Sequence, residues 1–174
     1  MAGITEHPMS EILIRPVAQS DLAALTAIYN HYIATTAITF DLEPKTIADR
    51  QSWLDAFAPS GRHQCFVAVA DGEAVGWACS AKLREKAAYD TSVETSIYVK
   101  DGIYRRGLGR RLYTTLFEAL ATEDVHRAYG CITVPNEPSV AIHLAMGFKL
   151  VGGFHEVGRK FGRFWDVAWY EKTL

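Results

Sequence analysis

The hydrophobic pattern of the chain changes its period in the middle of the sequence. Across residues 92–99 (SVETSIYV), apolar or β-branched residues alternate with polar ones, which predicts a strand with two different faces. From Leu108 to Leu120, leucine recurs at every fourth position, which predicts a helix with one apolar stripe. The segment between them contains the run RRGLG. The pattern therefore predicts a strand, a glycine turn and a helix in succession.

The rest of the chain shows the same two periods, without a long linker or an internal repeat. Asp71-Gly72 is a hairpin signal between two strand-like runs, and Ser20-Asp21 is a predicted N-cap for the first helix. Because strands and helices are mixed along the chain, the predicted fold class is α/β. The other predicted strands are 11–17, 64–70, 73–83, 128–134, 148–157 and 164–174, and the other predicted helices are 22–32, 46–57 and 138–146.

The composition is typical of one folded domain, predicted to span residues 1–174, with 49% hydrophobic and 22% charged residues. Eighteen Lys and Arg against twenty Asp and Glu give a net charge of −2, which disfavours nucleic-acid binding. No apolar run approaches the ~20 residues that a membrane helix needs, and the start of the chain lacks an export-signal pattern. We therefore expect a cytoplasmic protein without a membrane or nucleic-acid partner.

The three cysteines are odd in number and widely separated. Cys65, Cys79 and Cys131 all stand among apolar neighbours, which is typical of reduced core residues in a cytosolic protein. No H-E-x-x-H or C-x-x-C motif occurs, so no metal is expected.

The glycine turn contains the most informative candidate chemistry. The start of a helix exposes unpaired backbone N–H groups and a partial positive charge, and glycines let an anion approach closely. The third glycine of a dinucleotide fingerprint is missing, because Leu112 stands three residues after Gly109, and no Gly-Lys-Ser/Thr of a P-loop occurs. A phosphate cradle and a simple tight turn with solvated arginines both fit these residues. The candidate anion-binding residues are Arg105, Arg106, Gly107, Leu108, Gly109 and Arg110.

Residues 104–109 resemble the (Gln/Arg)-x-x-Gly-x-(Gly/Ala) motif of the GNAT superfamily of N-acetyltransferases, with Tyr104 at the first position. Within that superfamily, residues 12–170 resemble the phosphinothricin acetyltransferases and the methionine sulfoximine/sulfone acetyltransferases. The resemblance is carried by AITFDLEP, AYDTSVETSIYV, the run Asn136-Glu137-Pro138-Ser139-Val140 with His143, Met146-Gly147-Phe148, and VGRKFGRFWDV.

The resemblance implies an α/β (α+β) GNAT fold, in which a mixed, mostly antiparallel central sheet is splayed at its middle and flanked by helices. It implies acetyl-CoA as co-substrate, its pantetheine arm entering between strands 92–99 and 128–134 like an additional strand. The Val99 N–H would then polarise the thioester carbonyl. Asn136 and Ser139 are equally good turn and helix-cap residues. The implied contacts to the arm are the backbone of Ile97, Tyr98 and Val99, together with Asn136 and Ser139.

Acyl transfer to an amine needs a base for the amine and a proton for the departing thiolate. Glu94, in the strand before the glycine turn, is the predicted base, in agreement with the resemblance; a solvated glutamate is the alternative. His143, four residues before the glycine of Gly-Phe, is the predicted acid; a packing or capping histidine is the alternative.

An amino-acid-like substrate presents a carboxylate that must meet cations or N–H donors. Arg84 and Lys86 are the candidate cations, although solvated loop charges fit them equally and LREKAAYD matches neither related version of this loop. The candidate substrate-binding residues are Phe40, Arg84, Lys86, Tyr89, Glu94, Thr95 and Ser96.

The sequence and the resemblance thus predict transfer of acetyl from acetyl-CoA to the α-amine of a small amino-acid analogue, by direct attack in a ternary complex. Phosphinothricin and methionine sulfoximine/sulfone are the first candidate substrates, and herbicide resistance would follow from acetylation of phosphinothricin. A peptide or protein N-terminal acetyltransferase and a catalytically silent acyl-CoA-binding module remain as alternatives. A homodimer is expected through the aromatic run Phe161, Phe164, Trp165 and Trp169, residues that would serve equally well as core.

Overall fold

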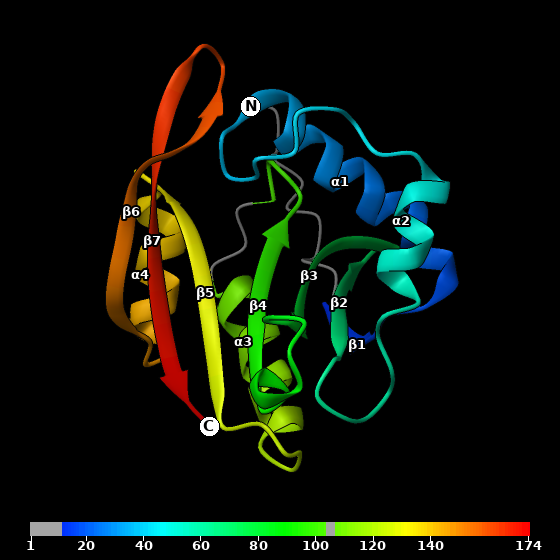
Figure 1. The fold of residues 1–174 in the computed structure, drawn as a ribbon. Coiled ribbons are helices and arrows are strands. Elements are labelled where there is room, and N and C mark those ends of the chain that lie inside the picture. Colours follow the sequence, from blue (N-terminus) through cyan, green and yellow to red (C-terminus); the bar gives the residue numbers. More distant parts are fainter. Residues whose placement is uncertain (1–11, 104–106) are drawn as a thin grey trace, which may run out of the picture.

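The computed structural model of the chain describes residues 12–103 and 107–174, so the predictions for Tyr104, Arg105 and Arg106 lie outside the described residues. A seven-stranded sheet with the order β1-β2-β3-β4-β5-β7-β6 forms its centre (Figure 1). Every strand pair is antiparallel except β4 with β5, which is parallel. The strands are β1 Leu13–Pro16, β2 Cys65–Ala70, β3 Glu73–Lys82, β4 Ser92–Val99, β5 Arg127–Val134, β6 Lys149–Lys160 and β7 Arg163–Thr173.

Helices cover the sheet from both sides. The α-helices are α1 Leu22–Thr35, α2 Ile47–Leu54, α3 Leu108–Leu120 and α4 Glu137–Ala145, and short 3-10 turns span Gln19–Asp21 and Ala87–Tyr89. α1 and α2 pack on the face of β2, β3 and β4 that Trp77 and Cys79 occupy, which we call the α1 face. α3 packs on the opposite face, the α3 face, which Ala78 and Val93 occupy.

The leucine stripe of α3 forms the centre of the main core. Leu108, Leu112, Leu116 and Leu120 are all buried, as the four-residue spacing predicts. They face small side chains of the sheet, among them Ala68, which let the helix approach closely. Burying a leucine side chain contributes about 1.5–3 kcal/mol, so this stripe fixes α3, and with it the glycine turn, against the sheet.

An aromatic cluster fills the α1 face. Trp77 of β3 stacks on Tyr98 of β4 with ring centroids 4.9 Å apart, and Tyr29 of α1 meets Tyr98 edge-on at 5.4 Å. The buried guanidinium of Arg50 lies 3.6 Å from the ring centre of Trp53 in α2. Aromatic and cation–π contacts of this kind hold α1 and α2 on the sheet beyond simple area burial.

One local prediction is wrong and another holds in part. Cys65 and Cys79 are buried as predicted, but Cys131 is exposed, because strand alternation turns it away from the core face that Ala128 and Ile132 of β5 occupy. Asp21 is the N-cap residue of α1, as predicted, but its carboxylate forms no capping hydrogen bond to the helix; it accepts hydrogen bonds from the Ala18 N–H and from Arg15 and so fixes the preceding 3-10 turn.

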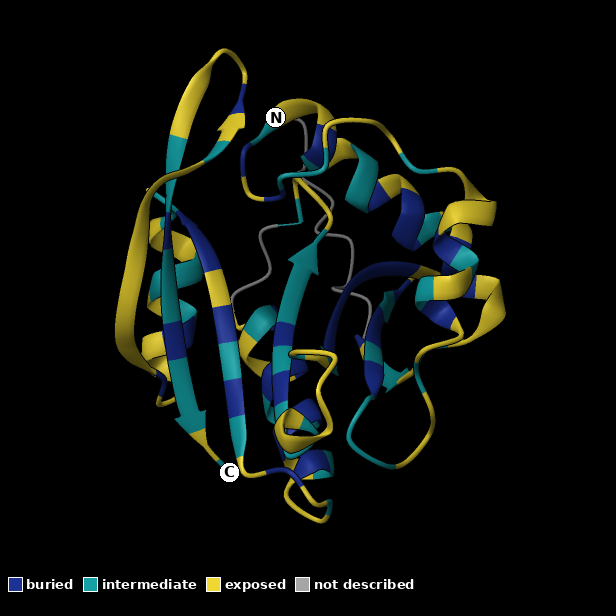
Figure 2. Ribbon diagram, viewed as in Figure 1, coloured by how far each residue is buried: buried dark blue, intermediate teal, exposed yellow. Residues whose placement is uncertain are grey.

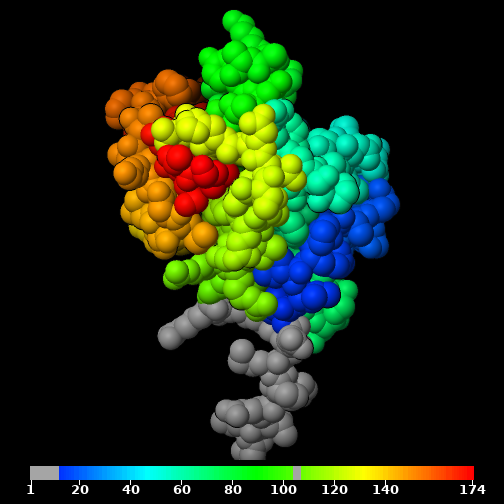
Figure 3. All heavy atoms as spheres, turned by 90° about the horizontal axis from the view of Figure 1, so that it is seen from below, coloured from blue at the N-terminus to red at the C-terminus, as the bar shows by residue number. Residues whose placement is uncertain are grey.

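The C-terminal hairpin is longer than its sequence pattern indicates. β6 continues to Lys160, and nearly all of its residues are exposed (Figure 2). At the other end of the sheet the last residues of β7 lie beside the start of β5 (Figure 3), where Thr173 pairs with Arg127. Within the described part of the chain, no helix is long and apolar enough to span a membrane.

Candidate active site

β4 and β5 pair only at their starts. The parallel ladder joins residues 92–94 to residues 127–129, and the last link is the Thr95 hydroxyl, which donates to the Tyr129 carbonyl at 3.1 Å. Beyond this point the strands separate (Figure 1), and a narrow cavity of about 40 Å³ lies between them. The splayed sheet that the family resemblance implies is therefore confirmed.

The open edge of β4 presents backbone groups to this gap. The Lys100 N–H donates to the Val75 carbonyl of β3 at 2.8 Å, so the alternation of a strand directs the N–H and C=O groups of Ile97 and Val99 toward the gap. The same alternation directs those of Tyr98 toward β3, so Tyr98 does not offer the backbone contact that was expected of it. The Tyr32 hydroxyl donates to the Val99 carbonyl at 2.6 Å, which leaves the Val99 N–H as the group that this residue presents to the gap.

The glycine turn enters α3 through a left-handed residue. Gly107 is the N-cap with φ +82°, a conformation that a β-carbon disfavours. Gly109 lies inside the helix, where a β-carbon would come within 2.7 Å of Ile142 Cδ1, so its part is the close approach of α3 to α4. Leu108 is a core residue, and Arg110 is exposed beside Gly107 in a groove between β1 and α3. Gly107 has no side chain to cap α3, so among the described residues the start of this helix has N–H groups from which an anion could accept hydrogen bonds.

Asn136 and Ser139 form a helix cap. The Asn136 side chain accepts a hydrogen bond from the Ser139 N–H at 3.2 Å and so begins α4. Both residues also line the gap, across from Ile97. The helix-cap role that the sequence left open for Asn136 and Ser139 is therefore present. The same position at the start of α4 would bring both residues into contact with a ligand in the gap.

His143 is enclosed under β5, with 3% of its surface exposed. Its Nδ1 lies 2.7 Å from the Ser139 carbonyl, which only accepts, so Nδ1 carries the proton and Nε2 accepts from the Tyr113 hydroxyl at 3.0 Å. Burial lowers the pKa of His143, although the bond to Ser139 opposes this, so the imidazole is neutral near pH 7. With no proton on Nε2, this geometry argues against the predicted role of His143 as the acid for the thiolate.

Glu94 lies at the point where the sheet opens. It is the last residue of β4 that pairs with β5, and it is half-buried. Burial raises the pKa of the Glu94 carboxyl, and the charge of Arg84 offsets this only in part. A carboxyl group with a raised pKa beside a gap in the sheet is suited to accept a proton from an amine.

Arg84 and Cys131 lie near Glu94, and Trp169 lies beside both of them; the sequence indicated neither Cys131 nor Trp169 for this site. The Arg84 guanidinium lies 5.7 Å from the ring centre of Trp169 in β7, and Cys131 of β5 pairs with Trp169 across the strands. Partial enclosure and the nearby Glu94 charge raise the pKa of the Cys131 thiol to about 11. Only the strand register, set by the complete fold, brings these side chains together; the nearest signal in the sequence was the aromatic C-terminal run.

The other predicted substrate residues separate into two groups. Ser96 lines the gap, and Phe40 packs against Gly158 of β6. Thr95 also lines the gap, but it is 3% exposed and its hydroxyl already donates to the Tyr129 carbonyl, so we do not assign it to the substrate. Lys86 and Tyr89 are exposed around the 3-10 turn, and no hydrogen bond, ion pair or ring contact between described residues joins them to Glu94.

The sequence also missed two buried partners of this region, Tyr113 in α3 and Lys160 in β6. Tyr113 directly follows Leu112 of the leucine stripe, and Lys160 is part of the segment VGRKFGRFWDV that carries the family resemblance, but neither was singled out from the sequence. Within residues 12–103 and 107–174, no three His, Cys, Asp or Glu side chains are grouped to hold a metal ion.

A sheet that opens between two parallel strands, with a helix N-terminus beside the opening and a carboxylate at its closed end, is the arrangement that the family resemblance implies for an acyl-CoA-dependent transferase. The family model "Acetyltransferase (GNAT) domain" matches residues 14–169, so the chain belongs to the GNAT acetyltransferase family and is an N-acetyltransferase.

Comparison with named proteins indicates which acetyltransferases of this family the chain resembles. The chain is 50% identical over 167 residues to the phosphinothricin N-acetyltransferase of Streptomyces coelicolor. The aligned region covers 95% of this chain and 98% of that protein. It is 32% identical to the L-methionine sulfoximine/L-methionine sulfone acetyltransferase of Pseudomonas paraeruginosa, over 92% of this chain and 94% of that protein. The crystal structure of a GNAT superfamily phosphinothricin acetyltransferase from Sinorhizobium meliloti, in complex with AcCoA, superposes with a TM-score of 0.87 at 27% identity, covering 94% of this chain and 88% of that one.

Proposed function

We propose that this protein transfers an acetyl group from acetyl-CoA to the α-amine of a small amino-acid analogue of the phosphinothricin or methionine sulfoximine/sulfone type. The amine attacks the thioester carbonyl directly, with both substrates bound together; the C–N bond forms, the C–S bond breaks, and the coenzyme A thiolate leaves and takes up a proton from solvent. The names of the relatives support this class of acceptor. The observation that carries the proposal is the position of Glu94, half-buried at the closed end of the gap.

Glu94 acts as the base. An α-amine is largely protonated near neutral pH and must lose a proton to attack. A carboxyl group of ordinary pKa is a weak acceptor for that proton, whereas burial at the end of the gap brings the pKa of Glu94 closer to that of the amine. Arg84, at the same end, attracts the carboxylate of the amino acid and so directs the amine toward Glu94.

The donor side is built from main-chain groups. Acetyl-CoA supplies the activated thioester carbonyl. The backbone groups of Ile97 and Val99 pair with its pantetheine arm, and the Val99 N–H polarises the carbonyl. The N-terminal amides of α3 and the exposed Arg110 hold its phosphates, and Asn136 and Ser139 line the opposite side of the arm. We assign Arg105 and Arg106 to the same phosphate site, because they directly precede Gly107 in the sequence.

We assign only some of the predicted substrate residues to the amine-binding pocket. We assign Arg84, Ser96 and Phe40 to it, joined by Trp169 and Cys131. Their side chains offer one cation, a hydroxyl and two aromatic surfaces, which suits a compact zwitterion with a short polar side chain. A peptide acceptor would need an extended groove across the same position.

Thiol release from acetyl-CoA, measured over a panel of phosphinothricin, methionine sulfoximine, methionine sulfone, common amino acids and peptides, tests the proposal. We expect turnover with free amino-acid analogues and a loss of about 100-fold or more in kcat for Glu94→Gln, at an unchanged Kd for acetyl-CoA. Glu85→Gln is the matched control, because Glu85 is an exposed carboxylate in the segment between β3 and β4, the strand that holds Glu94. Turnover with peptides alone would assign the peptide N-terminal activity, and acetyl-CoA binding without any turnover would assign a regulatory module.

We propose in addition that one domain spanning residues 1–174 forms a cytoplasmic homodimer. The edge strand β6 and the tip of its hairpin expose large apolar side chains, and a second copy would cover them. Light scattering on the purified protein tests this, and a monomer at micromolar concentration would refute it. The exposed side chains are Leu150, Val151, Phe154, Val157, Phe161 and Phe164.

A further inference from the structure

Lys160, the last residue of β6, is a cation inside the protein. It is 4% exposed, and its Nζ donates to the Thr39 carbonyl at 2.9 Å, across 121 residues of sequence. Nζ also lies 5.2 Å from the ring centre of Phe161. Burial lowers the pKa of Lys160, and the charge of Asp41 opposes this. No carboxylate of the described residues forms an ion pair with Lys160. Its ammonium group is instead hydrogen-bonded to the main chain of the loop that contains Thr39.

A second contact joins the same two segments. The ring of Phe40, the neighbour of Thr39, occupies the space beside Gly158, where a β-carbon would come within 2.2 Å of Phe40 Cε2. Gly158 and Lys160 are two positions apart in β6, so both contacts come from one face of the strand. The loop is therefore attached to the hairpin at two adjacent residues, one through a hydrogen bond and one through an aromatic ring.

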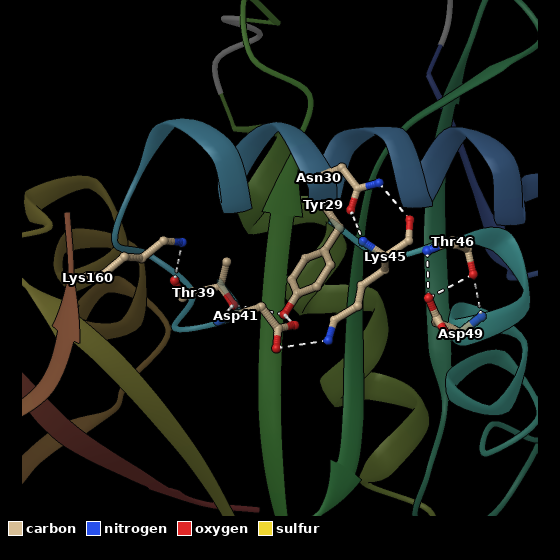
Figure 4. A network of polar contacts seen from close by, with 8 residues as sticks. All are labelled: Tyr29, Asn30, Thr39, Asp41, Lys45, Thr46, Asp49 and Lys160. Carbon is tan, nitrogen blue, oxygen red and sulfur yellow. Dashed lines mark hydrogen bonds and ion pairs between the residues drawn. The ribbon is translucent and has the colours of Figure 1, made fainter. Parts of the chain in front are cut away.

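The loop that receives these contacts joins α1 to α2 and comprises residues 36–46 (Figure 4). Its α2 end is already fixed: Asn30 exchanges hydrogen bonds with the backbone of Lys45, and the Tyr29 hydroxyl donates to Asp41 at 2.8 Å. Ile38, on the other side of Thr39, lines the gap between β4 and β5. Thr39 is therefore held from two sides: its hydroxyl lies 2.8 Å from the Tyr29 hydroxyl of α1, and its carbonyl accepts from Lys160 of β6, which is the described hydrogen bond that joins this part of the loop to the hairpin.

We propose that Lys160 is a positioning residue for the amine substrate. By holding the Thr39 carbonyl, it seats Phe40 on Gly158 and keeps residues 38–40 in place as the outer wall of the amine pocket. The inference rests on the proposed function, because Phe40 is a substrate wall only in an enzyme that acetylates a small amine. It assigns to β6 a part in acceptor binding that its exposed surface alone does not indicate.

Steady-state kinetics of three variants tests the inference. We expect Lys160→Met to raise KM for the accepted amine by about 10-fold or more, with kcat and KM for acetyl-CoA within about 2-fold of wild type. Lys160→Arg keeps a charged donor and should restore KM to within about 3-fold. Lys149→Met, which removes an exposed lysine from the other end of β6, is the matched control and should change nothing.

Two further measurements separate positioning from a general loss of structure. Amide hydrogen exchange should rise by about 10-fold in residues 36–41 of Lys160→Met, and not elsewhere in the sheet. Phe40→Ala should raise the amine KM by a similar factor, and the double variant should be no worse than Phe40→Ala, because both changes remove the same wall. An unchanged amine KM, unchanged exchange in the loop, or a joint fall of kcat and acetyl-CoA affinity would overturn the inference. Failure of the proposed function is distinct, since wild type would then acetylate none of the amines.

Discussion

Gly130 of β5 gives the structure its sharpest steric prediction. A β-carbon at this position would lie 2.6 Å from His143 Nε2 and 2.7 Å from its Cδ2, far inside contact distance. The ring has no room to withdraw, because hydrogen bonds to Ser139 and Tyr113 hold both of its nitrogens and Phe148 packs against it at a centroid distance of 4.9 Å. Gly130→Ala must therefore displace the imidazole.

The cost follows from two contributions. Overpacking a filled core costs about 1–3 kcal/mol, and the loss of one buried hydrogen bond adds about 1 kcal/mol. We expect Gly130→Ala to lower the free energy of unfolding by about 2–4 kcal/mol, which for a chain of this length lowers Tm by roughly 5–12 °C.

Urea and thermal unfolding followed by circular dichroism measure this change. Gly152→Ala is the matched control: Gly152 also lies in a strand, but a β-carbon there meets nothing within 4 Å, so we expect a change of less than about 0.5 kcal/mol. The double variant Gly130→Ala/His143→Ala should recover part of the loss, because the truncated side chain frees the space. A Gly130→Ala protein as stable as Gly152→Ala would refute the placement of His143 under β5.

Three further predictions concern titrating groups. Because burial raises the pKa of Glu94 above its ordinary 4.5, the folded protein is disfavoured once this carboxyl ionises, so Glu94→Gln should be inactive yet more stable than wild type at pH 8 and equally stable at pH 4; greater stability of wild type at pH 8 would contradict this. His143→Gln should lower kcat by less than about 10-fold at pH 8, and a loss beyond about 100-fold in rate assays would restore the histidine as the acid. Burial raises the pKa of Asp21, but the hydrogen bonds from Arg15 and Ala18 outweigh this and leave the pKa below its ordinary 3.8. Asp21→Asn should therefore lower the free energy of unfolding by about 1–3 kcal/mol at pH 7, and by less as the pH falls below 3.8 and the carboxylate takes up a proton. Urea titrations at several pH values would show this.

The periodic parts of the fold were predictable because their cause is local. The leucine stripe of α3 and the alternation in β4 each follow from which side of one element must be buried, and the structure confirms both. The place of Glu94 in this strand was predictable for the same reason, whereas its role as the base stays a prediction. The family resemblance supplied the splayed sheet, which periodicity alone does not contain.

Side-chain partners were not predictable, because they depend on segments that meet only in the complete fold. Cys131 has apolar neighbours in sequence but lies on the face of β5 opposite to Ala128 and Ile132 and is exposed. Thr95 has a hydroxyl suited to a substrate, yet the separation of β4 from β5 leaves the Tyr129 carbonyl for it. Lys160 receives its partner from a loop 121 residues away.

A sheet that parts in its middle exposes strand edges in the interior of the protein, and such edges recruit strands from other chains. Here two hydroxyl groups take up carbonyls along the opening: Thr95 bonds to Tyr129 at its closed end, and Tyr32 bonds to Val99 farther along β4. A foreign strand would find an acceptor missing at each of these positions. The same arrangement that keeps the slot ready for a narrow ligand thus discourages aggregation through it.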